Sequence, residues 1–327
     1  MAAMDAARDT LAIISVNYRS APDTLECIQS VLETGEMPWM VVVDNDSGDG
    51  SVETMADWAA KQPRLKDDYE VRNGGAEPSA LTKRLTIVRN PVNGGFSSGN
   101  NAGLRLAERT EGVELFWLLN NDTTVEPDAV DAVLAYFRDH PETGMAGTQL
   151  RLYHDQDWFQ LLNGMRFSKW TGAAGGIGAG ERVTRDFDPA QVAAQTDFVC
   201  GASLIMTRNF FDAVGYLEER FFLYYEEIDL AFRGRKFPIG FVDKAVVYHK
   251  EGASAGSASQ LSARARSPLS EYHHIRSKMI FARKHLPWVV PIYGLQNIVI
   301  LMRRLLRRQP PQARAIWRAM TGKPLNG

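Results

Sequence analysis

The sequence predicts an α/β protein with a mostly parallel central sheet, helices on both faces of that sheet, and a basic helical extension at the C-terminus. Two observations lead to this prediction. Apolar runs of strand length alternate with amphipathic helical patterns through the first two-thirds of the 327 residues, which is typical of a parallel sheet. The stretch from Tyr272 to the end contains eleven Lys or Arg residues and no Asp or Glu.

The first half of the chain contains four strand–helix units. Four segments dominated by apolar residues are expected to be buried strands, and they lie at residues 11–18, 39–43, 85–88 and 115–119. A helix is expected after each strand, where a polar residue or a proline precedes an amphipathic pattern, beginning near Ser20, Ser51, Ser98 and Pro127. The polar segment 61–84 contains Gly74, Gly75 and Pro78, and we interpret it as a surface insertion.

The second half of the chain is less regular. Strands are expected at residues 198–206 and 239–248, and helices at 225–235 and 268–285. Segment 153–195 is glycine-rich and is interpreted as irregular. Segment 254–265 consists mainly of small and polar residues, and it is interpreted as a mobile loop.

Composition and charge limit the class of protein. An apolar content of 45% and a charged content of 23% are typical of a soluble globular chain. Two widely separated cysteines give no disulfide framework, and the N-terminus lacks the pattern of a secretory signal. Because 11 of the 37 basic residues lie in the tail, residues 1–271 keep 26 against 39 acidic residues, a net charge of −13. A basic tail on an acidic body indicates an anionic partner, either membrane lipid or nucleic acid.

Polar turns follow three of the expected strands, at residues 44–50, 90–101 and 120–124. The carboxyl ends of parallel strands are where such sheets bind ligands. In "FWLLNNDTTV" a buried strand runs directly into Asn120, Asn121 and Asp122, whose oxygens suit either a turn or a hard cation such as Mg²⁺. The glycines at 94–103 match neither a dinucleotide fingerprint nor a phosphate-binding P-loop.

Carboxylates also cluster at the start of the expected helix 225–235. Glu226, Glu227 and Asp229 fall within four positions, which indicates either favourable charges at a helix N-terminus or a general base. His249 follows a strand, and a lone histidine is more often structural than a ligand.

Seven strings together resemble the family 2 glycosyltransferases, in particular their rhamnosyltransferase-like branch. In chain order they read "ISVNYRS", "VVVDNDSGDGS", "NGGFSSGNNAG", "LLNNDT", "VCGASLIMTR", "FFLYYEEIDLAFR" and "VVYHKEGAS". The resemblance spans residues 10–285 and rests on the order of the motifs. It implies a GT-A fold, with a catalytic domain at 10–255 made of a nucleotide-binding half (10–125) and an acceptor half (126–255). A basic helical extension at 256–327 then follows.

The resemblance also implies roles for individual residues on the donor side. Asn17 and Asp44 would contact the nucleoside, with Asn93, Asn100 and Asn121 completing the nucleotide-binding candidates. Asp122 matches the ligand carboxylate of the family's Asp-x-Asp metal motif, and His249 matches a residue that helps to hold the metal or the diphosphate. The implied cofactor is Mg²⁺ or Mn²⁺. Asn120 at the first position of the motif departs from the family pattern.

On the acceptor side, Gly201 and Ala202 match the segment beside the sugar and the acceptor, and Glu226 is expected next to them. The family's catalytic base is the Asp of a Glu-Asp pair. Here the pair is Glu226-Glu227, so Glu227 takes the place of the base with a side chain one methylene longer.

The function implied is a metal-dependent, inverting glycosyltransferase acting in cell-surface polysaccharide synthesis. dTDP-L-rhamnose leads as the donor and UDP-sugars follow, with a glycan or lipid-linked saccharide as the acceptor. Two alternatives stay open: a catalytically silent nucleotide-sugar or glycan-binding protein of the same fold, and a sugar nucleotidyltransferase. The second would need a basic glycine-rich loop near the N-terminus, and "NYRSAPD" is not one.

The basic tail predicts attachment to a membrane. Residues 286–302 are largely apolar and are followed by "RRLLRR", which is typical of an interfacial segment held by arginines. At 17 residues this apolar segment is short for a membrane span. We therefore expect a cytoplasmic protein, peripheral on the inner face of the membrane. Nucleic acid is not expected as a partner because the tail lacks interleaved base-stacking aromatic residues.

Overall fold

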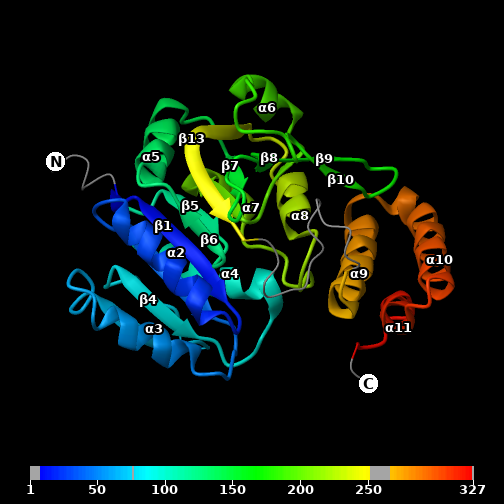
Figure 1. The fold of residues 1–327 in the computed structure, drawn as a ribbon, viewed down its shortest axis with the longest axis horizontal. Helices are drawn as coiled ribbons and strands as arrows, with labels where there is room; N and C mark the ends of the chain where they lie inside the picture. The colour runs from blue at the N-terminus through cyan, green and yellow to red at the C-terminus, as the bar shows by residue number, and fades with distance from the viewer. Residues whose placement is uncertain (1–7, 76, 251–265, 326–327) are drawn as a thin grey trace.

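The computed structural model describes residues 8–75, 77–250 and 266–325. A ten-stranded mixed sheet forms the centre of the protein, and helices cover both of its faces (Figure 1). The strand order is β3-β4-β2-β1-β5-β12-β7-β13-β6, with β8 paired to β7. This arrangement confirms the predicted α/β class and the predicted helical C-terminal region.

The N-terminal part of the sheet is entirely parallel. Its strands are β1 (Leu11–Asn17), β2 (Trp39–Asp44), β3 (Tyr69–Asn73), β4 (Leu85–Arg89) and β5 (Leu115–Leu119). Four of them lie where the apolar runs predicted them. The surface insertion predicted at 61–84 is corrected, because it contains β3, an edge strand. The sequence "YEVRN" has the mixed polarity of a strand that is only partly buried, so no apolar run marked it.

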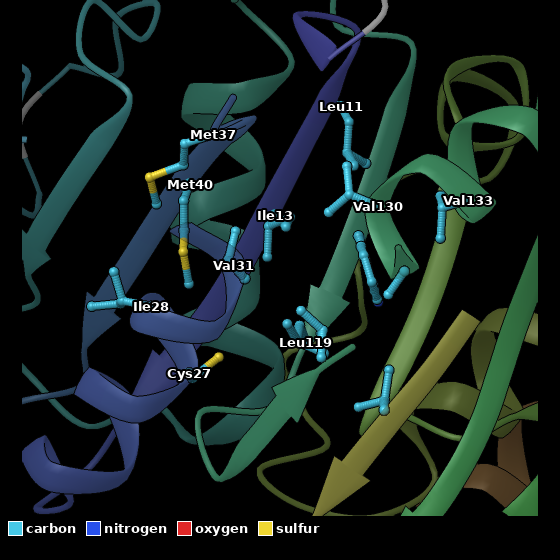
Figure 2. Close-up of a cluster of buried hydrophobic side chains, with 14 of the residues drawn as sticks. Leu11, Ile13, Cys27, Ile28, Val31, Met37, Met40, Leu119, Val130 and Val133 are labelled. Atoms are coloured by element: carbon cyan, nitrogen blue, oxygen red, sulfur yellow. The ribbon is translucent and has the colours of Figure 1, made fainter. Parts of the chain in front are cut away.

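Alternating side chains of the strands bury two faces of this sheet. Helices α2 (Ala21–Glu33), α3 (Ser51–Ala59) and α5 (Ala129–Asp139) pack on one face, where Figure 2 shows Ile13 beside Ile28, Val31 and Met40. Helix α4 (Gly95–Ala107) packs on the other face with the neighbouring strand residues. It begins three residues before the start expected at Ser98.

The second part of the sheet contains β6 (Thr123–Val125), β7 (Met145–Leu152), β12 (Ser203–Thr207) and β13 (Ile239–His249). Strand β12 lies antiparallel between β5 and β7, and β6 pairs antiparallel with the end of β13. The strand predicted at 198–206 is two strands, β11 (Phe198–Val199) and β12. A tight turn separates them, in which the Ser203 amide donates to the Cys200 carbonyl at 3.1 Å.

The segment predicted to be irregular contains short elements. They are β8 (Phe159–Leu162), β9 (Gly164–Phe167), β10 (Ala174–Gly176) and α6 (Pro189–Gln195). Strands β9, β10 and β11 form a small antiparallel sheet beside the main one. The mobile loop predicted at 254–265 lies outside the described residues.

The remaining helices are α7 (Arg208–Val214), α8 (Glu226–Arg233), α9 (Pro268–His285), the short 3₁₀ helix η1 (Pro287–Val289), α10 (Val290–Leu306) and α11 (Pro310–Met320). Helices α9, α10 and α11 form a group at one side of the molecule (Figure 1). Helix α9 packs against α8, since Phe281 contacts Phe232 and Lys284 pairs with Asp229 at 2.7 Å. The boundary expected at 255–256 falls outside the described residues, so the division into domains stays a prediction.

Candidate active site

The turn after β5 and the end of β13 bring Asp122 and His249 together. Thr123 and His249 are partners in the β6–β13 ladder, which places Asp122 beside the histidine. Asp122 Oδ1 lies 3.1 Å from His249 Nε2, and Gln160 Oε1 lies 2.9 Å from Nδ1 on the other side of the ring. Both residues are buried, with 5% and 8% of their surface exposed. The imidazole is therefore held between two oxygen atoms and faces the carboxylate.

The electrostatic environment keeps Asp122 ionised. Burial alone would raise the pKa of this carboxyl group, but the charge and hydrogen bond of His249 and a backbone N–H outweigh it, so the pKa is lowered. The two candidate metal residues thus offer one anionic oxygen and one ring nitrogen at the same place. Among the described residues, no group of three or more His, Cys, Asp and Glu side chains gathers that could hold a metal ion.

The pair fits a cation that takes few protein ligands. Mg²⁺ in nucleotide enzymes is bound by one or two carboxylates, and phosphate oxygens and water fill the other positions. Asp122 supplies such a carboxylate. Gln160 holds the His249 ring in place, as outer partners of metal-binding histidines do. Sequence analysis did not identify Gln160, because it lies in the segment interpreted as irregular.

The nucleotide-binding candidates form a buried chain of hydrogen bonds. Asn17 Nδ2 donates to Asp44 Oδ1 at 2.7 Å, because these residues are register partners at the ends of β1 and β2. Thr24 Oγ1 donates to Asn17 Oδ1 at 2.8 Å and accepts from Asn121 Nδ2 at 2.9 Å. The chain therefore connects the expected nucleoside end to the residue next to Asp122. Thr24, which the sequence did not reveal, is the link between them.

Asn93 and Asn100 lie at helix α4 in different surroundings. The Asn93 side chain accepts from the Gly95 amide at 2.9 Å and from Asn45 Nδ2 at 3.1 Å. Asn100 is buried, and its amide donates to the Phe96 carbonyl of the same helix at 2.9 Å. Asn45 joins this cluster to the end of β2, and no motif in the sequence distinguished it from its neighbours. Contact between these side chains and a nucleotide stays a prediction.

The candidate base is packed against a glycine. A Cβ atom on Gly201 would lie 2.5 Å from Glu227 Oε1, so only glycine leaves room for the carboxylate there. Helix α8 is preceded by Tyr224 and Tyr225, which both have positive φ values, of 68° and 76°. Backbone of this kind is strained for residues other than glycine, and it is frequent at functional sites. Ala202 is buried beside them, and its carbonyl accepts from the Asn120 amide at 3.0 Å.

Three neighbouring carboxylates have three different environments. Burial raises the pKa of Glu227, although backbone N–H groups at Glu227 and Gly201 partly oppose it. Burial and then the charge of Glu227 raise the pKa of Glu226 well above its usual range. Its Oε2 has no hydrogen-bond partner in the described part of the chain.

Asp229 pairs with Arg233, Lys284 and His285, each at 2.7 Å, and so joins α8 to α9. Asp229 therefore has a structural role, whereas burial disfavours the charged form of Glu226.

One cavity connects the two candidate centres. It has a volume of about 990 Å³, and both Glu227 and His249 line it. Asp122 lies directly behind His249, through the contact already described. Residues of α9 and α10 form another part of the cavity wall, among them Lys278 and Val299. The arrangement can hold an anionic leaving group at one end and remove a proton in its interior.

Glycosyl transferase family 2 matches residues 12–214 of the chain. The chain belongs to this family. The matched segment contains the Asp44 and Asp122 turns and Gly201, and it ends before Glu227. Family membership confirms the wider resemblance, whereas the rhamnosyltransferase-like branch stays a prediction.

Known proteins agree with this assignment. The low-salt glycan biosynthesis hexosyltransferase Agl10 of Haloferax volcanii is 24% identical over 232 residues, which are 70% of this chain and 62% of that protein. This chain thus spans less than two-thirds of that relative. The Pyrobaculum calidifontis mannosyltransferase PcManGT, solved with GDP-Man and Mn²⁺, aligns with 97% of this chain and 76% of its own, with a TM-score of 0.52 and 15% identity. GalNAc-T7, solved with UDP, GalNAc and Mn²⁺, aligns with 82% of this chain and 47% of its own, with a TM-score of 0.54 and 12% identity. These structures confirm the predicted GT-A fold.

Proposed function

We propose that this glycosyltransferase moves a hexose from a nucleotide-diphosphate donor to a hydroxyl group of a glycan or lipid-linked saccharide, and that it inverts the anomeric carbon. The observation that carries the proposal is the shared cavity, because Glu227 and the His249–Asp122 pair serve the same space. Two separate cavities would leave a proton acceptor and a leaving-group site unable to act on one substrate.

Glu227 is the proposed general base. A raised pKa makes a carboxylate a better proton acceptor near neutral pH, and burial gives Glu227 such a pKa. As the acceptor oxygen bonds to the anomeric carbon, the bond from that carbon to the donor phosphate breaks and the acceptor proton moves to Glu227. Burial disfavours the charged form of Glu226 beside it. A single displacement of this kind inverts the anomeric carbon.

Asp122 and His249 are the proposed ligands of Mg²⁺ or Mn²⁺. The cation, when bound, would offset the negative charge that develops on the leaving nucleoside diphosphate. The ionised state of Asp122 and the fixed ring of His249 are what a cation needs from this chain. The Mn²⁺ in the two solved transferases supports the proposal by analogy of fold.

The hydrogen-bonded chain from Asp44 to Asn121 is the proposed nucleoside site, together with Asn93 and Asn100. By resemblance, dTDP-L-rhamnose is proposed as the first donor to test, followed by UDP-sugars. GDP-mannose belongs in the same series, because PcManGT was solved with it.

A catalytically silent binding protein is the second candidate. Asn120 occupies the first position of the metal motif, and this departure favours it. Nothing in the structure favours a nucleotidyltransferase. Hydrolysis or transfer of each donor, measured with Mn²⁺ and again with EDTA, tests both candidates. The proposed function requires turnover that EDTA abolishes, and donor binding without any turnover would show a silent protein.

Attachment to an anionic membrane is proposed for α10 and α11. Residues Pro287–Leu306 form 20 residues of helix, longer than the 17-residue stretch expected, and by length and composition alone they are sufficient to cross a membrane. Arg303, which is exposed near the end of this helix, favours an interfacial position on the cytoplasmic side instead. Several tail cations are used inside the protein, for example Arg304 with Glu271. Arg307, Arg308 and Arg314 are exposed, and each would add about 1 kcal/mol near anionic lipid.

Co-sedimentation with vesicles tests this attachment. The chain should bind phosphatidylglycerol-containing vesicles at low salt and much less at high salt, because a Debye length shortens as salt rises. Equal recovery with neutral phosphatidylcholine vesicles would contradict an electrostatic attachment.

A further inference from the structure

The part of the cavity wall formed by α9, α10 and the residue just before α9 carries positive charge. Lys278 of α9, Arg303 of α10 and Arg266, just before α9, all line it. His274 of α9 lines it as well, and its Nδ1 has no hydrogen-bond partner among the residues described. This wall is separate from the strand ends that hold Asp122 and His249. It has no part in the chemistry proposed above.

Lys278 is the unusual residue of this wall. Only 4% of it is exposed, and its Nζ donates to the Thr171 carbonyl at 3.0 Å and to Gln296 Oε1 at 2.5 Å. Both partners are neutral, and within the described residues no carboxylate lies at ion-pair distance from it. Burial lowers the pKa of Lys278 to about 8, so the amine is still charged at neutral pH. A buried cation without an anion is costly, and a bound anion would remove that cost.

The same cavity extends to an apolar surface. Leu295 and Val299 line it, yet they are 64% and 43% exposed on α10. Their helix also exposes Ile298, Met302 and Leu305. The cavity therefore passes from a carboxylate, through a cluster of cations, to the helix face proposed to contact lipid.

We propose that this wall binds the phosphate of an amphiphilic acceptor. The acceptor's hydroxyl would lie at Glu227, its phosphate at Lys278, Arg266 and Arg303, and its hydrocarbon chain along Leu295 and Val299. The position of the hydroxyl rests on the function proposed above, whereas the phosphate site does not. Lysine and arginine recognise phosphate through charge-assisted hydrogen bonds, which the neutral partners of Lys278 leave available.

The donor diphosphate also carries phosphate groups that lysine and arginine recognise. The positions of the Lys278 contacts favour the phosphate of the acceptor. Lys278 makes its contacts with Thr171, Gln296 and the Tyr293 ring, all on the α9–α10 side of the cavity. The donor diphosphate is expected at the ends of β5 and β13. A phosphate at Lys278 would also lie next to the apolar face of α10, where a lipid carrier would leave the cavity.

Calorimetric titration with farnesyl phosphate and with farnesol, both below their micelle concentrations, tests the proposal without any turnover. Farnesyl phosphate should bind at least about tenfold more tightly, the value of one charge-assisted hydrogen bond. Lys278→Met should remove most of this difference. Arg303→Gln, at an exposed position where folding is not at risk, should reduce it. Lys244→Met is the matched control. It removes an exposed charge of β13 that does not line the cavity, and this variant should bind like the unaltered protein.

Three results would overturn the proposal. Equal affinity for farnesol and farnesyl phosphate would show that no phosphate is recognised. Unchanged farnesyl phosphate binding in both Lys278→Met and Arg303→Gln would remove these cations from the site. If Lys278→Met weakened UDP binding in Mn²⁺ as much as farnesyl phosphate binding, the cations would belong to the donor. Failure of the proposed transferase function has a different signature, which is the absence of turnover with every donor.

Discussion

Polar side chains are paired differently in the parallel half of the sheet and in helices α8, α9 and α10. At the ends of β1 and β2, Asn17, Asp44 and Thr24 are bonded to one another and buried. Within the described residues, the Glu226 carboxylate of α8 has an oxygen without a hydrogen-bond partner, and Lys278 of α9 has only neutral hydrogen-bond partners. The three side chains of the first region therefore partner one another, whereas in the second region an oxygen atom and a positive charge lack matching partners among the described residues.

The same contrast appears in the carboxylates of the two regions. The charge of His249 helps to lower the pKa of Asp122 against its burial, whereas burial raises the pKa of Glu227. A group that must stay anionic to attract a cation and a group that must accept a proton need opposite shifts. The proposed function assigns the cation to the first region and the general base to the second, and the following changes test that assignment.

The largest effect is expected from Glu227→Gln. An amide cannot accept the proton, so transfer should fall by about 10²–10⁴-fold while donor binding is retained. Single-turnover rates and donor titration measure the two quantities separately. Glu226→Gln is the matched control, because it makes the same change at a neighbouring carboxyl group whose charged form burial disfavours, and it should lose less than about tenfold. Equal losses in the two variants would contradict the assignment of the base.

Asp122→Asn tests the proposed cation site on the donor side. It removes the anionic oxygen and keeps the size of the side chain. The loss of activity should reach about 100-fold, the upper range seen when the partners of metal ligands are removed. Activity should respond to Mn²⁺ concentration, with half-saturation shifted to higher metal. An unchanged metal titration in Asp122→Asn would separate this carboxylate from the cation.

Gly201→Ala tests the contact between Glu227 and the turn that precedes β12. The new methyl group would meet the far end of the Glu227 side chain, so the carboxylate must move while the fold need not change. Activity should fall by about tenfold to 100-fold, as expected for a group displaced by about 1 Å. Gly175→Ala, where an added Cβ meets no atom within 4 Å, is the control and should keep its activity. Similar melting temperatures for the two variants would show that the loss is not one of stability.

The pH dependence follows from the direction of the Glu227 shift. A base works only when it is ionised, and the pKa of Glu227 is raised, so activity should be lost as pH falls through a midpoint above 4.5, the ordinary value for glutamate. The lowered pKa of Asp122 adds no step in that range. The rate should decline about tenfold per pH unit below the midpoint. A profile that stays flat down to pH 4.5 would argue against Glu227.

The smallest effect is expected from Thr24→Val, within the hydrogen-bonded chain from Asp44 to Asn121. The hydroxyl that links Asn17 to Asn121 is lost, and two buried amides lose a partner. The free energy of unfolding should fall by about 1–3 kcal/mol, with a modest loss of nucleotide affinity. Chemical denaturation measures the first quantity. A stability equal to that of the unaltered protein would show that this network is not needed to hold the sheet ends together.

The sequence predicted the parallel region well because its signals are local. Buried strands such as β2 and β5 are apolar runs, and α9 begins and ends at the expected residues. Strands β3, β6 and β7 to β10 were missed. Most of them are edge or short strands of mixed polarity, and β7, although central, contains glycine, threonine, glutamine and arginine. The stability of these strands comes from pairing with distant partners.

The site could be predicted only where residue type and motif order identified it. Asp122, His249 and Glu227 were predicted as site residues in this way, and the structure brings Glu227 and His249 to one cavity. Thr24 and Gln160 were not found, because their roles depend on contacts across the sheet that no local pattern encodes. Lys278 was noted only as one of the charges of the basic tail. Its burial is a product of tertiary packing.

The central claim is that Asp122 and His249 hold a cation in the cavity that Glu227 lines. Anomalous diffraction at the manganese edge, from crystals soaked with Mn²⁺ and a nucleoside diphosphate, tests it directly. We expect one strong peak within ligand distance of Asp122 and His249, with the diphosphate extending toward Glu227. A peak at another place, or a bound diphosphate with no manganese beside Asp122, would contradict the account.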